Sequence, residues 1–119
     1  MKTNKILNEL IKIPTFIKNT DTLHYAIWNR MRDANDILYH IATSPVLSLV
    51  AIEVSIIKFD RIIDDIAFCM NGDDFYDIIK YYSSITEFVL IELLEEEMYE
   101  GMENFKNFNT NYLEHINNK

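Results

Sequence analysis

An apolar repeat between residues 49 and 70 is the feature that most constrains how this chain can fold. Apolar side chains recur there at alternating spacings of three and four, which is the repeat of one helix face. Ala51, Ile62 and Ala67 widen that face. The pattern predicts a long central helix with a buried seam formed by Leu49, Ile52, Ile56, Phe59, Ile63, Ile66 and Met70.

Local signals predict where this helix begins and ends. Ser44 followed by Pro45 is a hydroxyl cap before a proline at the first helical position, where the missing N–H costs nothing, so the helix is predicted to begin there. Asn71-Gly72 predicts its end, because glycine adopts the left-handed conformation without a steric penalty. Asp73 or Asp74 is then placed to cap the next helix.

The N-terminal part of the chain predicts two further helices. The first covers residues 2–13 and ends before Pro14, because proline disfavours helical geometry in the preceding residue. Thr20 or Asp21 can cap the second. Its predicted buried seam consists of Leu23, Ile27, Met31, Ala34, Leu38 and Ile41.

The C-terminal part predicts a short helix over residues 75–82 and then a long last helix. The sequence from Ser84 to Glu87 fits a capping box, in which serine and glutamate satisfy each other's backbone donors. The apolar register continues through Gly101 without a slip, so we expect one continuous helix. Its predicted seam is Ile91, Leu94, Met98, Gly101, Phe105, Phe108 and Tyr112.

Composition supports the same fold class. Only two glycines and two prolines among 119 residues leave little material for the turns of an all-β protein. A chain of this length buries enough surface to fold without disulfides or a structural metal. We predict an all-α bundle of about five helices with a long C-terminal helix, in a single domain over residues 1–119. Neither a signal peptide nor a membrane span is expected, so the predicted location is cytoplasmic, and Cys69 is expected to be buried.

The sequence contains no catalytic or cofactor-binding motif, so we predict a protein that is not an enzyme and has no cofactor. Its histidines are His24, His40 and His115, and no Glu-x-x-His pair or metal-ligand spacing includes them. Glycine loops that bind phosphate and serine nucleophile elbows are absent, since only two glycines are available. A strongly acidic chain is also unsuited to direct binding of nucleic acid.

Negative charge is concentrated in one part of the chain. Residues 60–103 contain 13 acidic and two basic side chains, a net charge of -11, whereas the whole protein carries -8. On the predicted last helix, four glutamates at positions 92, 96, 100 and 103 lie within about 80° of one another, which predicts a glutamate ridge. Such a ridge favours a cationic partner, because like charges at these spacings repel. The predicted partner-binding residues are Asp60, Asp64, Asp65, Asp73, Asp74, Asp77, Phe88, Glu92, Glu95, Glu96, Tyr99, Glu100 and Glu103.

A second candidate surface lies on the helix that follows residue 21. Tyr25, Trp28, Arg32 and Tyr39 share the side opposite its predicted seam. These residue types are enriched at binding hot spots, although a helix buried on both faces would also carry them. A homodimer through this face is one of the arrangements the sequence allows.

A small, acidic, helical, non-catalytic protein with one strongly negative surface resembles the bacterial immunity proteins that neutralise nuclease toxins, of bacteriocin or contact-dependent growth inhibition systems. The resemblance covers the profile of the whole chain and implies that the acidic surface binds the basic nucleic-acid-binding cleft of a toxin domain. Two alternatives stay open: an acidic nucleic-acid mimic of the phage type that inhibits a host machine, and a helical adaptor that binds through Tyr25, Trp28, Arg32 and Tyr39. A Bcl-2-like bundle also suits the size, but the central helix lacks an Asn-Trp-Gly-Arg signature.

Overall fold

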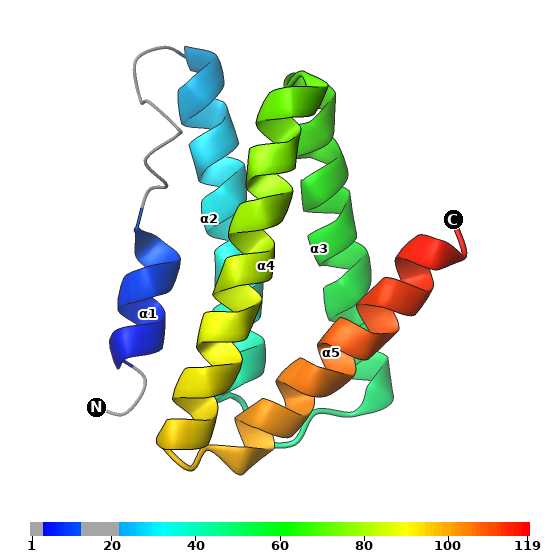
Figure 1. Ribbon diagram of the computed structural model, residues 1–119. Coiled ribbons are helices and arrows are strands. Elements are labelled where there is room, and N and C mark those ends of the chain that lie inside the picture. The colour runs from blue at the N-terminus through cyan, green and yellow to red at the C-terminus, as the bar shows by residue number, and fades with distance from the viewer. Residues whose placement is uncertain (1–3, 13–21) are drawn as a thin grey trace.

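The computed structural model describes residues 4–12 and 22–119, and these residues form five α-helices (Figure 1). They contain no β-strand, so the all-α helical bundle predicted from the sequence is confirmed. None of the described helices has both the length and the apolar character needed to cross a lipid bilayer. The helices are α1 (Asn4–Ile11), α2 (Thr22–Thr43), α3 (Leu49–Cys69), α4 (Gly72–Glu95) and α5 (Tyr99–Asn117).

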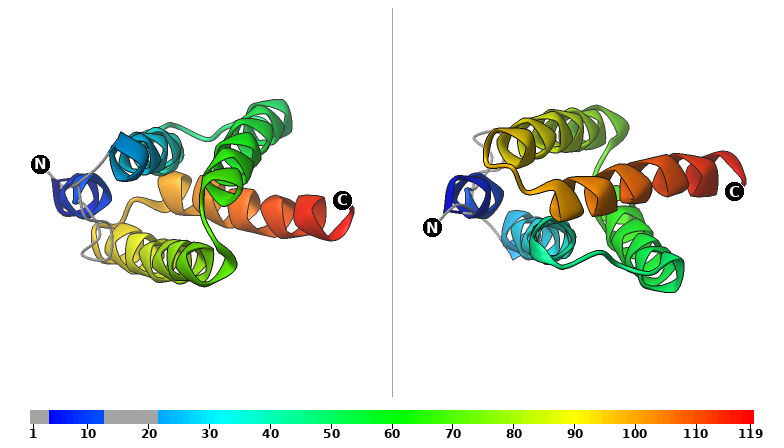
Figure 2. Two further views of the ribbon diagram at one scale, coloured as in Figure 1. Left: turned by 90° about the horizontal axis from the view of Figure 1, so that it is seen from above. Right: turned by 90° about the horizontal axis from the view of Figure 1, so that it is seen from below.

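Helix α2 lies at the centre of the packing. It contacts α1, α3 and α5, while α4 packs mainly against α1 and α5. Although α3 and α4 are consecutive, they make few contacts with each other. Seen from above and from below, α5 runs between them (Figure 2). The bundle is therefore open along one side, where α3, α4 and α5 form the walls of a groove.

The predicted seams of the second and third helices are mostly confirmed. On α2, Ile27, Met31, Ala34, Leu38 and Ile41 are each at most 3% exposed. The side chain of Leu23, the predicted caps Thr20 and Asp21, and Pro14 lie outside the described part of the chain. On α3, the seam from Ile52 to Ile66 is buried as predicted. Leu49 does not belong to it, because it is 69% exposed.

The predicted start of α3 at Ser44-Pro45 is wrong. The helix begins at Leu49, and its cap is Ser48, whose hydroxyl accepts a hydrogen bond from the backbone N–H of Ala51 at 3.1 Å. The buried side chain of Asn104 on α5 holds the preceding segment out of a helix. Its Nδ2 donates to the carbonyls of Ser44 and Pro45 at 3.1 and 3.0 Å, and its Oδ1 accepts from the N–H of Leu47 at 2.8 Å.

The turn between α3 and α4 forms where expected, but by a different mechanism. Gly72 is the first residue of α4 and has no positive φ. Asn71 caps the helix in place of Asp73 or Asp74, since its Oδ1 accepts from the N–H of Asp74 at 3.0 Å. Cys69, expected to be buried, is exposed.

The division of the C-terminal half into helices differs from the prediction. One continuous α4 replaces the short helix over 75–82 and the start of a new helix at Ser84. Burial explains this result, because Ile78, Tyr82, Ile85, Val89 and Leu93 form an apolar face that continues past Ser84 and outweighs its capping signal. The chain breaks instead between α4 and α5, within the stretch predicted to be one helix.

Gly101 allows α5 to begin directly against the end of α2. A Cβ atom at this position would overlap the carbonyl oxygen of Ala42 and lie 3.0 Å from its carbonyl carbon. Both partners are buried backbone, which cannot move aside as the end of a flexible side chain can. This close approach fixes the place of the first turn of α5.

Substitution of Gly101 by alanine tests this contact. We expect G101A to lower the free energy of unfolding by about 2–3 kcal/mol, because the added methyl group overpacks the α2–α5 junction. Urea denaturation monitored by circular dichroism measures the change. Gly72→Ala is the matched control: its Cβ would meet nothing within 4 Å, so it should not destabilise the protein. Equal effects of the two substitutions would contradict the contact.

Candidate protein-binding surface

A tight turn ends α4 and redirects the chain into α5. The N–H of Met98 donates to the carbonyl of Leu93 at 2.9 Å, and the N–H of Glu97 donates to the carbonyl of Leu94 at 3.1 Å. This pair of bonds defines a Schellman motif, which requires a left-handed residue just after the helix. Glu97 occupies that position with a φ of 57°, where glycine is the usual residue.

The turn divides the predicted glutamate ridge. Glu92 lies on the inner side of α4, only 8% exposed, and its Oε2 has no hydrogen-bond partner. Glu92 therefore lies in the interior, where it is little accessible to a partner, and its contact with a partner stays a prediction. Phe88 is half-buried against the core. Ile91 and Leu94, predicted to be buried, are instead 51% and 56% exposed.

Four exposed glutamates remain together around this turn. We call them the acidic corner: Glu95, Glu97, Glu100 and Glu103. Residues 81–105 include no lysine, arginine or histidine, and no described basic side chain forms an ion pair with any of the four. Glu96, the fifth glutamate here, is half-buried at the end of α4. Within residues 4–12 and 22–119, the negative charge of the corner is therefore not compensated by a basic partner.

Apolar side chains accompany the acidic corner. Tyr99, the first residue of α5, is 57% exposed, as its predicted role as an anchor requires. Ile91 and Leu94 are exposed on the last turns of α4, and the sequence prediction did not recognise them as surface residues. The observed seam of α4 ends at Leu93, five residues before Met98, whereas the predicted seam through Ile91 and Leu94 has no such break. Extending the seam from Ile78 to Leu93 was the sequence signal that could have revealed both the turn and these residues.

A hollow of about 470 Å³ opens between this turn and the end of α2. Glu97, Tyr99 and Glu100 line one side, while Thr43 and Ser44 line the other. The C-terminus of a helix carries partial negative charge, so α2 adds to the effect of the two carboxylates. The hollow is electrostatically suited to a cationic side chain.

Two of the predicted acidic residues form ion pairs with basic groups of the protein itself. Asp60 is 7% exposed; its Oδ2 lies 2.5 Å from Lys119 Nζ and 3.1 Å from His115 Nε2. Lys119 also contacts Asp64 at 3.2 Å. The hydrogen bond to Asp60 raises the pKa of the exposed Lys119 ammonium above its ordinary value. Asp60 and Asp64 thus anchor the end of α5 to α3.

The remaining predicted acids lie at the other end of α4. Asp65 is near the end of α3, and Asp73, Asp74 and Asp77 lie in the first turns of α4. About 33 Å of helix separates them from the acidic corner, at 1.5 Å per residue. Basic residues share this end, including Arg61 and Lys80, and Lys80 Nζ lies 4.8 Å from the ring centroid of Tyr76. The predicted acidic surface is therefore two separate clusters.

The second candidate surface on α2 is partly occupied by internal contacts. Trp28 is half-buried and packs against the core, with Tyr25 at 5.7 Å between ring centroids. The guanidinium carbon of Arg32 lies 5.6 Å from the Trp28 ring centroid. Tyr39 is also half-buried, so only Tyr25 and Arg32 are freely exposed.

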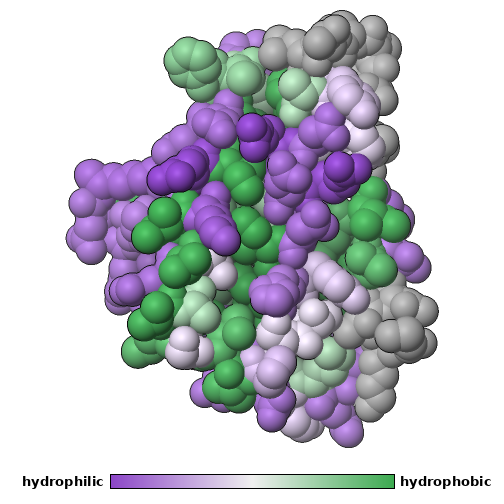
Figure 3. Space-filling view, turned by 180° about the vertical axis from the view of Figure 1, so that it is seen from behind, coloured by the Kyte–Doolittle hydropathy of each residue, from purple (hydrophilic) through white to green (hydrophobic). Residues whose placement is uncertain are grey.

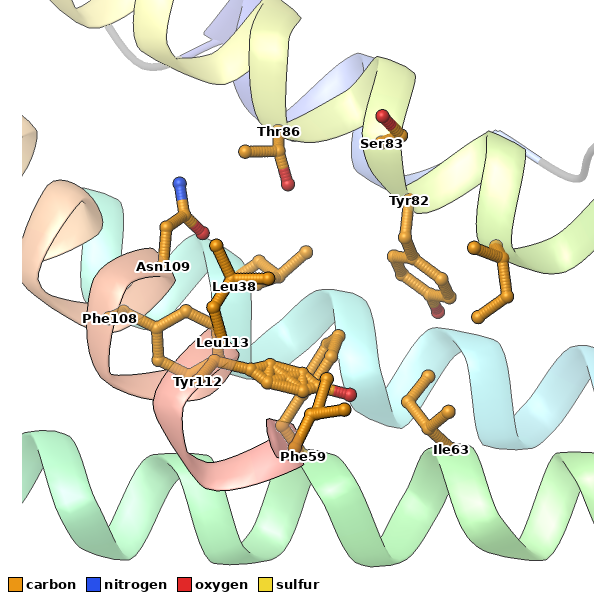
Figure 4. Close-up of a pocket in the computed structure, with 12 residues that line it drawn as sticks. Leu38, Phe59, Ile63, Tyr82, Ser83, Thr86, Phe108, Asn109, Tyr112 and Leu113 are labelled. Atoms are coloured by element: carbon orange, nitrogen blue, oxygen red, sulfur yellow. The ribbon is translucent and has the colours of Figure 1, made fainter. Parts of the chain in front are cut away.

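The groove between α3, α4 and α5 has an aromatic floor and a volume of about 450 Å³ (Figure 4). Phe59 packs edge-on against Tyr82, Phe108 and Tyr112, with ring centroids 5.2–5.5 Å apart. Burial raises the pKa of Tyr82 well above its ordinary value. The pKa of Tyr112 is also raised, mainly by burial and to a smaller extent by the negative charges of Asp60 and Asp64. No carboxylate or basic side chain lines the groove, so it offers no ion-pair partner to a ligand.

Comparison with known proteins gives no further guide to the site. No protein-family model matches the chain, and neither a curated protein nor a solved structure matches it. Within the described ranges, no three histidine, cysteine or carboxylate side chains gather closely enough to hold a metal ion. The acidic corner therefore has to be interpreted from its own chemistry.

The left-handed residue of the corner yields a prediction about stability. We expect Glu97→Gly to raise the free energy of unfolding by about 0.5–1 kcal/mol, because glycine adopts this conformation without the steric cost paid by glutamate. Glu103→Gly is the matched control and should lower it by about 1 kcal/mol, since Glu103 lies inside α5. Thermal and urea denaturation measure both. A loss of stability for Glu97→Gly equal to that of the control would contradict the Schellman turn.

Proposed function

We propose that this protein is a non-catalytic immunity protein that binds a basic nuclease toxin domain through the acidic corner. Bound there, it covers the nucleic-acid-binding surface or active site of the toxin. The observation that carries the proposal is the set of four exposed glutamates that have no basic partner among the described residues, beside the exposed side chains of Ile91, Leu94 and Tyr99.

Charge and apolar surface have different roles in this proposal. The uncompensated glutamates accelerate association with a basic surface and select against acidic partners. Tyr99 and the neighbouring apolar side chains slow dissociation, because aromatic residues dominate interface energetics. The hollow lined by Glu97 and Glu100 is a suitable place for an arginine or lysine of the partner.

A nucleic-acid mimic that inhibits a host machine would use the same acidic corner, so the identity of the partner separates the two functions. The adaptor alternative depends on α2, where Trp28 and Tyr39 are half-buried. The acidic corner is more accessible than that face of α2 and carries more exposed charge of one sign. It is therefore the surface we assign to partner binding.

Charge reversal at the acidic corner tests the proposal. Tagged protein is used to capture partners from the cells that naturally produce it, and the recovered protein is identified by mass spectrometry and assayed on RNA and DNA. We expect one basic nuclease, inhibited when the tagged protein is added. The triple variant Glu95→Lys, Glu100→Lys and Glu103→Lys should weaken its binding at least about tenfold, because long-range attraction and close contacts are both lost.

The variant Asp65→Lys, Asp73→Lys and Asp77→Lys is the matched control. It alters the net charge of -8 by the same six units at the other end of α4. We expect it to weaken binding less than about threefold, through long-range charge alone. If the control variant weakens binding more than the triple variant does, the partner binds at the other acidic cluster. Recovery of a partner without nuclease activity would contradict the immunity function.

A further inference from the structure

An exposed apolar stripe lies along the first half of α3, on the side away from the core. Val50, Val54 and Ile57 are 70%, 46% and 50% exposed, and Val46 extends the stripe at its start. We call these four residues the α3 stripe. Seen from behind, hydrophobic side chains gather over the region where α3 begins (Figure 3).

The opposite side of the same helix is fully used by the core. Ile52 and Ile56 are at most 3% exposed, so apolar residues occupy both faces of α3 here. A helix that is apolar all round is normally buried on all sides. The stripe exposes on the order of 400 Å² of apolar surface, within the range of the largest patch on a typical monomer, and patches of this size are often functional.

The charged residues beside the stripe indicate what covers it. Glu53 and Lys58 lie on opposite edges, about 140° apart around the helix at 100° per residue. Both are exposed, and neither has an ion-pair partner in the described chain. Glu53 also lines a hollow with Glu114 and His115 of α5, so a second carboxylate lies beside it.

In a pair of parallel helices, two charged residues five positions apart on opposite edges can form ion pairs across the interface. When two parallel helices pack around a two-fold axis, a residue on one edge faces the residue five positions later on the opposite edge of the partner helix. Glu53 of one copy then faces Lys58 of the other, and symmetry forms this pair twice. In the same arrangement Val50, Val54 and Ile57 meet at the centre.

We propose that the α3 stripe is a homodimer interface, in which α3 packs in parallel against α3 of a second copy and Glu53 pairs with Lys58 of that copy. A stable interface buries about 800 Å² per partner, and the stripe supplies about half of it as apolar surface. Arg61, one turn after Ile57, ends the stripe. In Figure 1, α3 begins at the lower right, at the same end of the bundle as the α4–α5 turn, and then runs away from that turn.

Analytical ultracentrifugation over a range of concentrations tests the proposal. The measured mass of wild-type protein should rise from 14.1 kDa toward twice that value as the concentration rises. Glu53→Lys and Lys58→Glu should each weaken dimerisation at least tenfold, because like charges then face each other twice. The double variant E53K/K58E exchanges the signs and should return the dissociation constant to within about threefold of wild type.

Two apolar substitutions complete the experiment. Val54→Arg, at the centre of the stripe, should leave the protein monomeric at all concentrations. Ile91→Arg is the matched control on α4, where a similarly exposed apolar residue should be replaceable without effect on dimerisation. Circular dichroism verifies that each variant folds. A wild-type monomer at every concentration would overturn the dimer, as would equal effects of Val54→Arg and Ile91→Arg, while failure of E53K/K58E to recover would overturn the parallel register.

Discussion

The buried amide of Asn104 is the interaction on which the rest of this structure depends. It is 1% exposed, and its Nδ2 and Oδ1 bind the backbone around the end of α2 and the start of α3. Loss of such a buried group leaves several backbone groups unsatisfied, each at a cost of about 1–3 kcal/mol. The same turns of α5 place Gly101 against Ala42, so one junction fixes α2, α3 and α5 relative to one another. Because α5 starts there, α4 has to end at the Schellman turn, and the acidic corner forms around it.

The periodicity of the sequence predicts most of the core, and it fails where two local signals compete. Ile56 and Leu38 are buried as predicted, and no competing local signal interrupts the apolar seams to which they belong. Ser84 resembles a helix start, yet the apolar face from Ile78 to Leu93 passes through it, and burial outweighs the cap. Leu49 continues the spacing of its seam, but it is the first residue of α3 and is 69% exposed there. No pattern in the sequence shows which carbonyl a distant asparagine will bind.

The candidate site could be predicted only in part from the sequence, because its arrangement depends on contacts between residues that are distant in the chain. The concentration of acids was readable from the sequence, but their arrangement depends on one backbone residue, Glu97, in a conformation that glutamate rarely adopts. Without that turn, Glu92 and Glu100 would share a face; with it, Glu92 is buried and Glu100 is exposed. Lys119 is distant in sequence from Asp60, and only the fold shows that it neutralises this acid. The acidic corner is therefore a product of tertiary structure, whereas its charge is a product of composition.

The central claim is that the acidic corner is the preferred surface for a basic, partly apolar partner. The most direct test is a titration of ¹⁵N-labelled protein with a hexapeptide of alternating arginine and phenylalanine, followed by amide chemical shifts in NMR spectra. The account predicts that the largest changes fall within residues 91–103 and diminish as salt is added, because four exposed glutamates and the exposed side chains of Ile91, Leu94 and Tyr99 lie together there. Largest changes within residues 64–77, or along α2, would contradict it.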